Sequence, residues 1–107
     1  MLYKFKSKAA AEVIMTSAHG DHVMRLIGKP PGQKGILLPQ EMPAALSALE
    51  QAIAQEEHAR RQAEQEAQAE GHSLPPPEDV SLRQRLWPLI EMIRRCHAAD
   101  KEIVWGV

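Results

Sequence analysis

The chain of 107 residues has a single cysteine, Cys96, and only four aromatic residues. One cysteine excludes a disulfide within the chain, and this is typical of proteins from reducing compartments. The scarcity of aromatic side chains argues against a nucleic-acid-binding module, because such modules stack bases on several aromatic platforms. No uninterrupted apolar run is long enough to cross a bilayer. We therefore expect a cytoplasmic protein that binds neither nucleic acid nor membrane.

Charge is nearly balanced overall but unevenly distributed. The formal net charge is −1. Residues 1–40 carry six basic and two acidic groups, residues 41–80 carry two and nine, and residues 81–107 carry five and three, so the net charges are +4, −7 and +2. Oppositely charged segments attract each other within one fold or between two copies of a chain. The pattern predicts that the arginines near the C-terminus, Arg83, Arg85, Arg94 and Arg95, pair with the acidic middle of the chain.

The last third of the chain predicts a buried helix followed by a strand. Its apolar residues recur at spacings of three and four, which places them on one helical face; they are Leu82, Leu86, Leu89, Ile90, Ile93 and Cys96. Ser81, followed three residues later by Gln84, matches a capping box. Pro88 predicts a kink or bulge within the helix. Residues 102–107 are rich in β-branched and aromatic side chains and predict a strand.

Two more strands are predicted earlier in the chain. Residues 1–7 alternate, with Tyr3 and Phe5 on one face and lysines on the other, as in a half-buried strand. Residues 36–38 predict a short buried strand between Gly35 and Pro39. The expected fold is α+β, a small sheet of about three strands packed on one face by helices, with the two terminal strands as partners.

The segment between these strands is helical in tendency but interrupted. Residues 9–15 predict a short helix or a buried turn, and Asp21 is expected to cap a second helical piece that ends at Gly28. Residues 28–35, rich in glycine and proline, predict a surface loop. Pro30 and Pro31 supply no N–H groups, so a phosphate cradle is not expected there.

The middle of the chain predicts a long helix that begins near Pro43. Met42, Leu46, Leu49 and Ile53 mark its buried face. Residues 54–70 have alanine as their only apolar residue and predict a solvated helical extension with the ion pairs Glu56–Arg60 and Glu57–Arg61. Residues 71–79 predict a proline-rich connector. We treat residues 1–107 as one domain, with residues 54–79 as its polar extension and connector.

The nearest approach to a metal site is the cluster His19, Asp21 and His22. Two histidines three residues apart can offer two ligands from one helical turn, but zinc needs three or four converging donors. The alternative is that Asp21 caps a helix and the histidines are exposed. Cys96 and His97 are adjacent on a helix, so their side chains diverge by about 100° and His97 is poorly placed as a base. No catalytic residue and no cofactor site is predicted.

Several motifs together resemble a family of small bacterial proteins classified as domain of unknown function 1840. The segments that carry the resemblance are Phe5–Ala9, Leu26–Lys29, Met42–Leu46, Ser81–Arg85, Trp87–Met92 and Val104–Val107. The extension and the connector match least. The resemblance implies a compact cytoplasmic α+β protein and assigns no activity, cofactor or catalytic residue.

The function that the sequence favours is a non-enzymatic, cytoplasmic protein–protein interaction or regulatory domain, with a homodimer as one option. It is favoured because no convergent polar constellation is evident and because the charges are segregated. The alternative is a metal- or small-molecule-binding protein that uses His19, Asp21 and His22. An enzyme would need a concave pocket on which polar groups converge.

Overall fold

The computed structural model describes residues 2–76 and 80–107, and within these ranges the chain forms four strands, three α-helices and one 3₁₀ helix. The strands are β1 (Leu2–Phe5), β2 (Val13–Thr16), β3 (Gly35–Leu37) and β4 (Ile103–Trp105). The helices are α1 (Ser17–Ile27), η1 (Pro39–Glu41, the 3₁₀ helix), α2 (Met42–Ala69) and α3 (Leu82–Ala99). The predicted α+β class is confirmed. Residues 77–79 of the predicted connector lie outside the described residues.

The strands form two antiparallel pairs, β1 with β2 and β3 with β4. One isolated bridge joins the pairs, since Lys6 and Val104 exchange backbone hydrogen bonds of 2.8 and 2.9 Å. The predicted pairing of the terminal strands is therefore limited to this single residue pair. The prediction of about three strands missed β2, which was expected to be a helix or a turn. Its four residues carry no clear alternation, and pairing with β1 decides their conformation.

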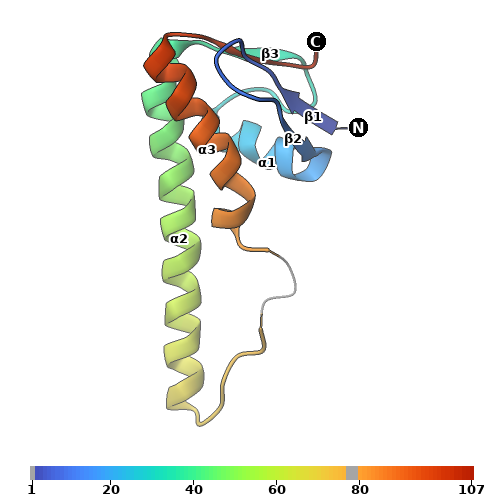
Figure 1. The fold of residues 1–107 in the computed structure, drawn as a ribbon. Coiled ribbons are helices and arrows are strands. Elements are labelled where there is room, and N and C mark those ends of the chain that lie inside the picture. The colour runs from blue at the N-terminus through green and yellow to red at the C-terminus, as the bar shows by residue number, and fades with distance from the viewer. Residues whose placement is uncertain (1, 77–79) are drawn as a thin grey trace.

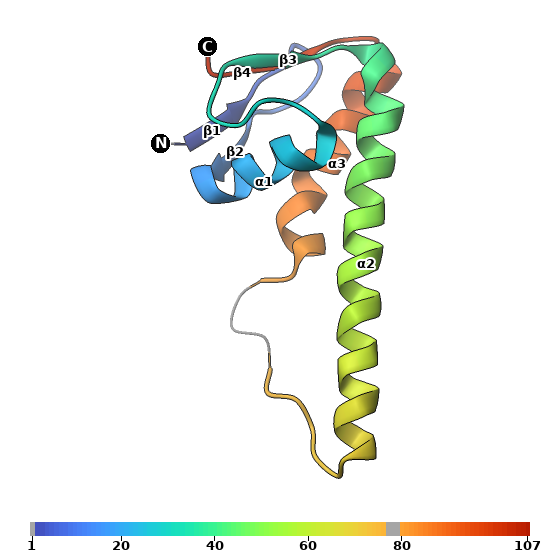
Figure 2. The same ribbon diagram turned by 180° about the vertical axis from the view of Figure 1, so that it is seen from behind.

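The helices lie on one side of the two strand pairs, as Figure 1 and the reverse view in Figure 2 show. α3 runs alongside the half of α2 that is nearer the strands, and α2 continues well beyond the rest of the molecule. The shape is accordingly elongated, with extents of 52 × 28 × 22 Å. The predicted helical extension is thus an arm that projects from the body.

The core lies between the inward face of the strands and the three helices. Its largest fully buried side chains are Trp105, Phe5, Met24, Met42, Leu49, Leu86, Ile90, Ile93 and Ile103. Tyr3, Phe5 and Trp105 form a row of rings, with centroid separations of 6.0 Å and 5.7 Å. Of the four residues predicted on the buried face of α2, Met42, Leu49 and Ile53 are buried and Leu46 is partly buried. Leu86 and Trp105 belong to the core.

α1 begins at Ser17, four residues before the predicted cap. Its N-cap residue is Thr16, and Gly28 ends the helix in the left-handed conformation with φ of 80°, as predicted. Gly20 lies within the helix because the ring of Tyr3 packs directly on it: a Cβ on Gly20 would lie 1.9 Å from Tyr3 Cδ2. Asp21 is therefore an interior helical residue, and its expected role as a cap is wrong.

The other local predictions have mixed outcomes. Ser81 and Gln84 form the predicted capping box, and the helix continues across Pro88, which lies on its exposed side. The strand β3 is only partly buried, since Leu37 is buried whereas Ile36 is 41% exposed. At the end of α2, Ala67 is buried although the extension was expected to bury nothing. The connector folds back here: the His72 N–H donates to the Ala67 carbonyl, and Arg60 donates to that of Pro75.

Truncation of a core side chain tests this assignment. Trp105→Ala and Leu86→Ala should each lower the free energy of unfolding by about 3–5 kcal/mol, because each leaves a cavity that the core cannot refill. Urea denaturation measures the loss. Trp87→Ala is the matched control, since Trp87 is 44% exposed and its loss should cost no more than about 1 kcal/mol. Equal losses for the two tryptophans would contradict the core assignment.

Gly20→Ala tests the contact between β1 and α1 by the sign of its effect. Helix propensity alone predicts stabilisation by about 1 kcal/mol. The clash with Tyr3 predicts the opposite, a loss of about 1–3 kcal/mol from overpacking. Ala18→Gly, at an exposed position of the same helix, measures the propensity effect without the clash. A Gly20→Ala protein that is more stable than wild type would show that the ring does not lie there.

Candidate functional site

The outward face of the strands exposes apolar side chains. Alternation along each strand turns Tyr3, Phe5, Met15, Leu37, Ile103 and Trp105 inward and their neighbours outward. The pairing register then places the outward residues side by side: Lys4 is opposite Ile14, and Val104 lies between Lys6 and Ile36. We call Leu2, Lys4, Lys6, Ile14, Ile36 and Val104 the outer face.

Three large apolar side chains of the outer face are open to solvent. Leu2 and Ile14 are each 54% exposed, and Ile36 is 41% exposed. α1 and α3 lie against the opposite face of the strands, so that within residues 2–76 and 80–107 no helix covers these side chains (Figures 1 and 2). Two more exposed apolar residues, Leu38 and Val107, follow the ends of β3 and β4. Apolar groups gathered in this way mark an interaction surface more often than isolated ones do.

Lysines surround these apolar groups. Lys4 and Lys6 belong to the outer face, and Lys8 and Lys34 lie just beyond the ends of β1 and β3. The Lys6 ammonium donates a hydrogen bond of 3.1 Å to the Val107 carbonyl. A carboxylate, Glu102, shares a shallow hollow of about 200 Å³ with Lys6 and Lys8. The surface is therefore basic and apolar, with at least one acidic group at its edge.

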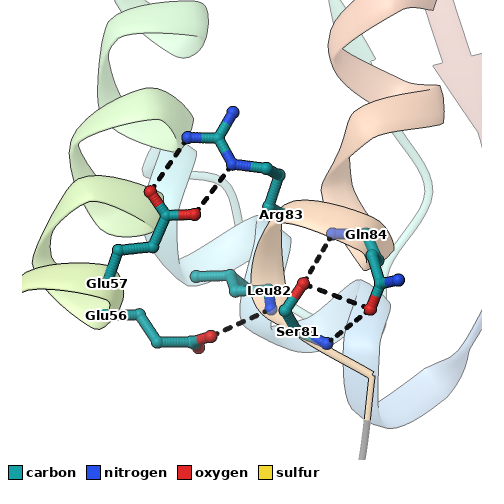
Figure 3. Close-up of polar contacts among 6 residues, drawn as sticks. All are labelled: Glu56, Glu57, Ser81, Leu82, Arg83 and Gln84. Carbon is teal, nitrogen blue, oxygen red and sulfur yellow. Dashed lines mark hydrogen bonds and ion pairs between the residues drawn. The ribbon is translucent and has the colours of Figure 1, made fainter. Parts of the chain in front are cut away.

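A second polar cluster joins the start of α3 to the middle of α2 (Figure 3). The Arg83 guanidinium donates two hydrogen bonds, of 2.8 and 2.9 Å, to the Glu57 carboxylate. The Glu56 carboxylate accepts from the backbone N–H of Leu82 at 3.0 Å. This N–H belongs to the first turn of α3, where helical carbonyl partners are lacking and negative charge is favourable. Glu56 thus supplies an N-terminal cap from another helix.

Farther along the same two helices, the Arg94 guanidinium binds Glu50 at 2.7 Å and Glu91 at 2.9 Å. It also lies over the ring of Trp87, at 5.4 Å from the centroid. The predicted pairing of the C-terminal arginines with the acidic helix is thereby confirmed for Arg83 and Arg94. The predicted pairs Glu56–Arg60 and Glu57–Arg61 are wrong. Both glutamates instead bind groups of α3, namely the Leu82 N–H and the Arg83 guanidinium. Arg60 forms an ion pair of 2.8 Å with Glu64.

The interface between these two helices contains a broad hollow of about 620 Å³ between α2 and the start of α3. Its walls carry three glutamates and three arginines, together with Val80 and Ser81; the charged residues are Glu56, Glu57, Arg60, Arg61, Glu64 and Arg85. The Arg85 Nε is buried without a hydrogen-bond partner. The formal charges of these six residues sum to zero.

The predicted metal ligands all lie on α1. His19, Asp21 and His22 are half-buried. The Asp21 carboxylate accepts a hydrogen bond from the Tyr3 hydroxyl, which also accepts one from the Gly32 N–H at 2.6 Å. Burial raises the pKa of Tyr3, and the bond to Asp21 raises it further, so the hydroxyl remains a donor. In the described parts of the chain, no three His, Cys, Asp or Glu residues lie together in a group that could hold a metal ion.

The other sites considered from the sequence were a reactive pair of Cys96 with His97 and a phosphate-binding loop at residues 28–35. The Cys96 side chain is fully buried, whereas His97 on the next position is exposed. The loop of residues 28–35 makes contacts within the fold. Its Gly32 N–H donates a hydrogen bond to the Tyr3 hydroxyl, and Lys29 forms a 2.8 Å ion pair with Glu41. The outer face was the feature that sequence reasoning missed. Residues 13–16 carry no clear alternation that could have signalled it, and only the pairing of β2 with β1 places Ile14 on the same side as Lys4.

Comparison with known proteins identifies the family. The model of the family described as Domain of unknown function (DUF1840) matches residues 1–105. The chain belongs to this family. The resemblance found in the sequence is thus confirmed. No curated protein and no solved structure matches the chain. Among the described residues, no helix has the length and apolar character needed to span a membrane.

The stability contributed by the interface between α2 and α3 should decrease at acidic pH. The bond from Arg83 lowers the pKa of Glu57, so its contribution to stability is present above the unfolded-state pKa of about 4.3 and is lost as the pH falls through the lower folded-state value. Glu57→Gln should therefore reduce the acid-side fall of the melting temperature. Thermal melts across acidic pH measure this.

Glu66→Gln is the matched control, because Glu66 is an exposed glutamate on the projecting arm of the same helix. It should leave the acid-side fall unchanged. Identical pH profiles for Glu57→Gln and wild type would show that the pair with Arg83 does not stabilise the fold.

Proposed function

We propose that the protein is a non-enzymatic, cytoplasmic protein–protein interaction module whose docking surface is the outer face. The observation that carries this proposal is the exposure of Leu2, Ile14 and Ile36 on strands whose opposite face is fully used by the core. Exposed apolar groups on a rigid strand scaffold are suited to binding, since little conformational entropy is lost when a partner covers them. The buried thiol of Cys96 supports a reducing compartment.

The occupant that fits is an acidic protein surface that presents apolar side chains. Lys4 and Lys6 stand among the apolar groups, and Lys8 and Lys34 flank them. An interface of this kind gains its affinity from apolar contact and its orientation and association rate from complementary charge. A second copy of the chain docked face to face would bring lysines against lysines.

A photo-reactive amino acid placed at Ile14 tests the proposal. In the full-length protein expressed in its own cells, irradiation should attach the protein to one partner, identified by mass spectrometry. The same label at Gln65, on the projecting arm, is the control and should capture no such partner. A partner captured at Gln65 but not at Ile14 would overturn the assignment of the docking surface.

The identified partner then allows the charge to be tested. Lys4→Glu should weaken binding about tenfold or more, with affinity that falls as salt is added, because a favourable charge contact becomes a repulsive one. Arg61→Glu, the same reversal on the arm, should leave affinity within about twofold, as expected beyond a Debye length. Equal effects of the two reversals would refute the acidic-partner proposal. So would a captured partner that is a second copy, or co-sedimentation with phosphatidylserine vesicles that depends on Lys4.

A further inference from the structure

The two strand pairs separate immediately beyond their single bridge. Lys6 and Val104 exchange two backbone bonds, and an antiparallel register continued from this pair would place Lys4 opposite Gly106. The structure records no backbone bond between those two residues. Gly106 adopts φ of 76° and turns the chain toward the 28–35 loop, where a Cβ on it would lie 2.6 Å from Lys34 Cα. β1 and β4 therefore diverge from the bridge outward.

The divergence leaves strand edges open. In an antiparallel strand, the N–H and C=O of one residue point to the same side, and alternate residues share that side. Because the backbone of Lys6 faces β4, the backbone groups of Lys4 and Leu2 face the same way. An unpaired edge of this kind is a template for another strand.

A pocket of about 290 Å³ occupies the space between the diverging strands. This volume lies just below the range for small-molecule pockets, about 300 to 1,000 Å³. Its lining comprises Leu2, Tyr3, Gly32, Gln33, Lys34, Trp105 and Gly106. Tyr3 and Trp105 are 7% and 1% exposed and form its floor, whereas Gln33 and Lys34 are exposed and form its rim. We call this pocket the strand gap.

The side chain of Trp105, which lines the strand gap, carries an unpaired hydrogen-bond donor. The Trp105 Nε1 is buried and has no partner. Its ring packs closely on Gly35, where a Cβ would lie 2.5 Å from Cζ2 and 2.9 Å from Nε1. Buried donors in folded proteins are almost always paired, and an exception calls for an explanation. An acceptor supplied by a ligand in the gap would be such an explanation.

We propose that the strand gap receives an extended segment of a partner protein, which pairs with the open edge of β1 at Lys4. A carbonyl of the segment would lie toward Trp105 Nε1, and an acidic side chain would lie near Lys34. This inference deepens the proposed function, since it states how a partner engages beside the outer face. Strand addition takes its affinity from main-chain hydrogen bonds and its selectivity from alternate side chains.

Titration with a peptide tests the inference. The probe is an acetylated, amidated pentapeptide of alternating glutamate and valine, added to the full-length ¹⁵N-labelled protein. The indole N–H signal of Trp105 and the amide signals of Lys4 and Gly106 should shift together, with a Kd of about 1 mM or tighter. Trp87 is the internal control: its indole lies outside the gap and should not move.

A pair of charge reversals provides the matched variants. Lys34→Glu should weaken the peptide about fivefold, the scale of one exposed ion pair. Lys101→Glu, at an exposed lysine in the turn before β4, should leave the affinity unchanged. Each variant is used only if its spectrum retains the dispersed signals of the folded protein. Equal affinity for Lys34→Glu and wild type would refute the placement of the acidic side chain.

The outcomes separate this inference from the proposed function. Absence of any shift at Trp105 and Lys4 at millimolar peptide would overturn the strand gap, because main-chain pairing tolerates many sequences. If the cellular partner still cross-links at Ile14 and responds to Lys4→Glu, the proposed function stands without the gap. If the peptide shifts the gap signals while no partner is captured at Ile14, the gap stands and the outer face fails.

Discussion

The contact between Tyr3 and Gly20 is the constraint on which the N-terminal half of the structure depends. The ring of Tyr3 takes the space that any side chain at position 20 would occupy, so β1 can lie directly across α1. This close approach brings the hydroxyl within reach of Asp21 and of the Gly32 N–H. One side chain thereby ties a strand, a helix and the 28–35 loop together, and the position of that loop in turn sets where β3 begins.

The row of rings compensates for the weak connection between the strand pairs. A single bridge, Lys6 with Val104, supplies the backbone bonds between them. Phe5 stands between Tyr3 and Trp105, 6.0 Å from one ring and 5.7 Å from the other, and so joins β1 to β4 through side chains. Aromatic pairs at such distances contribute about 0.5–1.5 kcal/mol each beyond the area they bury. Three of the chain's four aromatic residues are used for this connection, which allows the strands to diverge without separating the sheets.

Much of the fold was predictable because it is encoded locally. The capping box at Ser81, the stop at Gly28 and the apolar spacing of α2 and α3 each depend on residues within a few positions of one another. The predictions that failed concern features that depend on residues distant in the sequence. Gly20 and Asp21 suggest a break in the helix until the ring of Tyr3 is placed between them and the strand, and β2 exists because β1 lies beside it. The outer face shares this character, since Ile14 becomes a neighbour of Lys4, and Ile36 a neighbour of Val104, only through the pairing register.

The ion pairs show which of the oppositely charged segments of the chain neutralise each other. In the described ranges, the acidic middle of the chain pairs with the C-terminal arginines through Glu57–Arg83 and Glu50–Arg94, and with the N-terminal segment only through Lys29–Glu41. The N-terminal excess of positive charge is therefore not neutralised by the acidic helix, which projects away from the strands (Figure 1). Lys4 and Lys6 place part of it on the outer face, next to exposed apolar groups that the core does not use. A surface with both properties is complementary to the proposed partner, a protein segment that is acidic and presents apolar side chains.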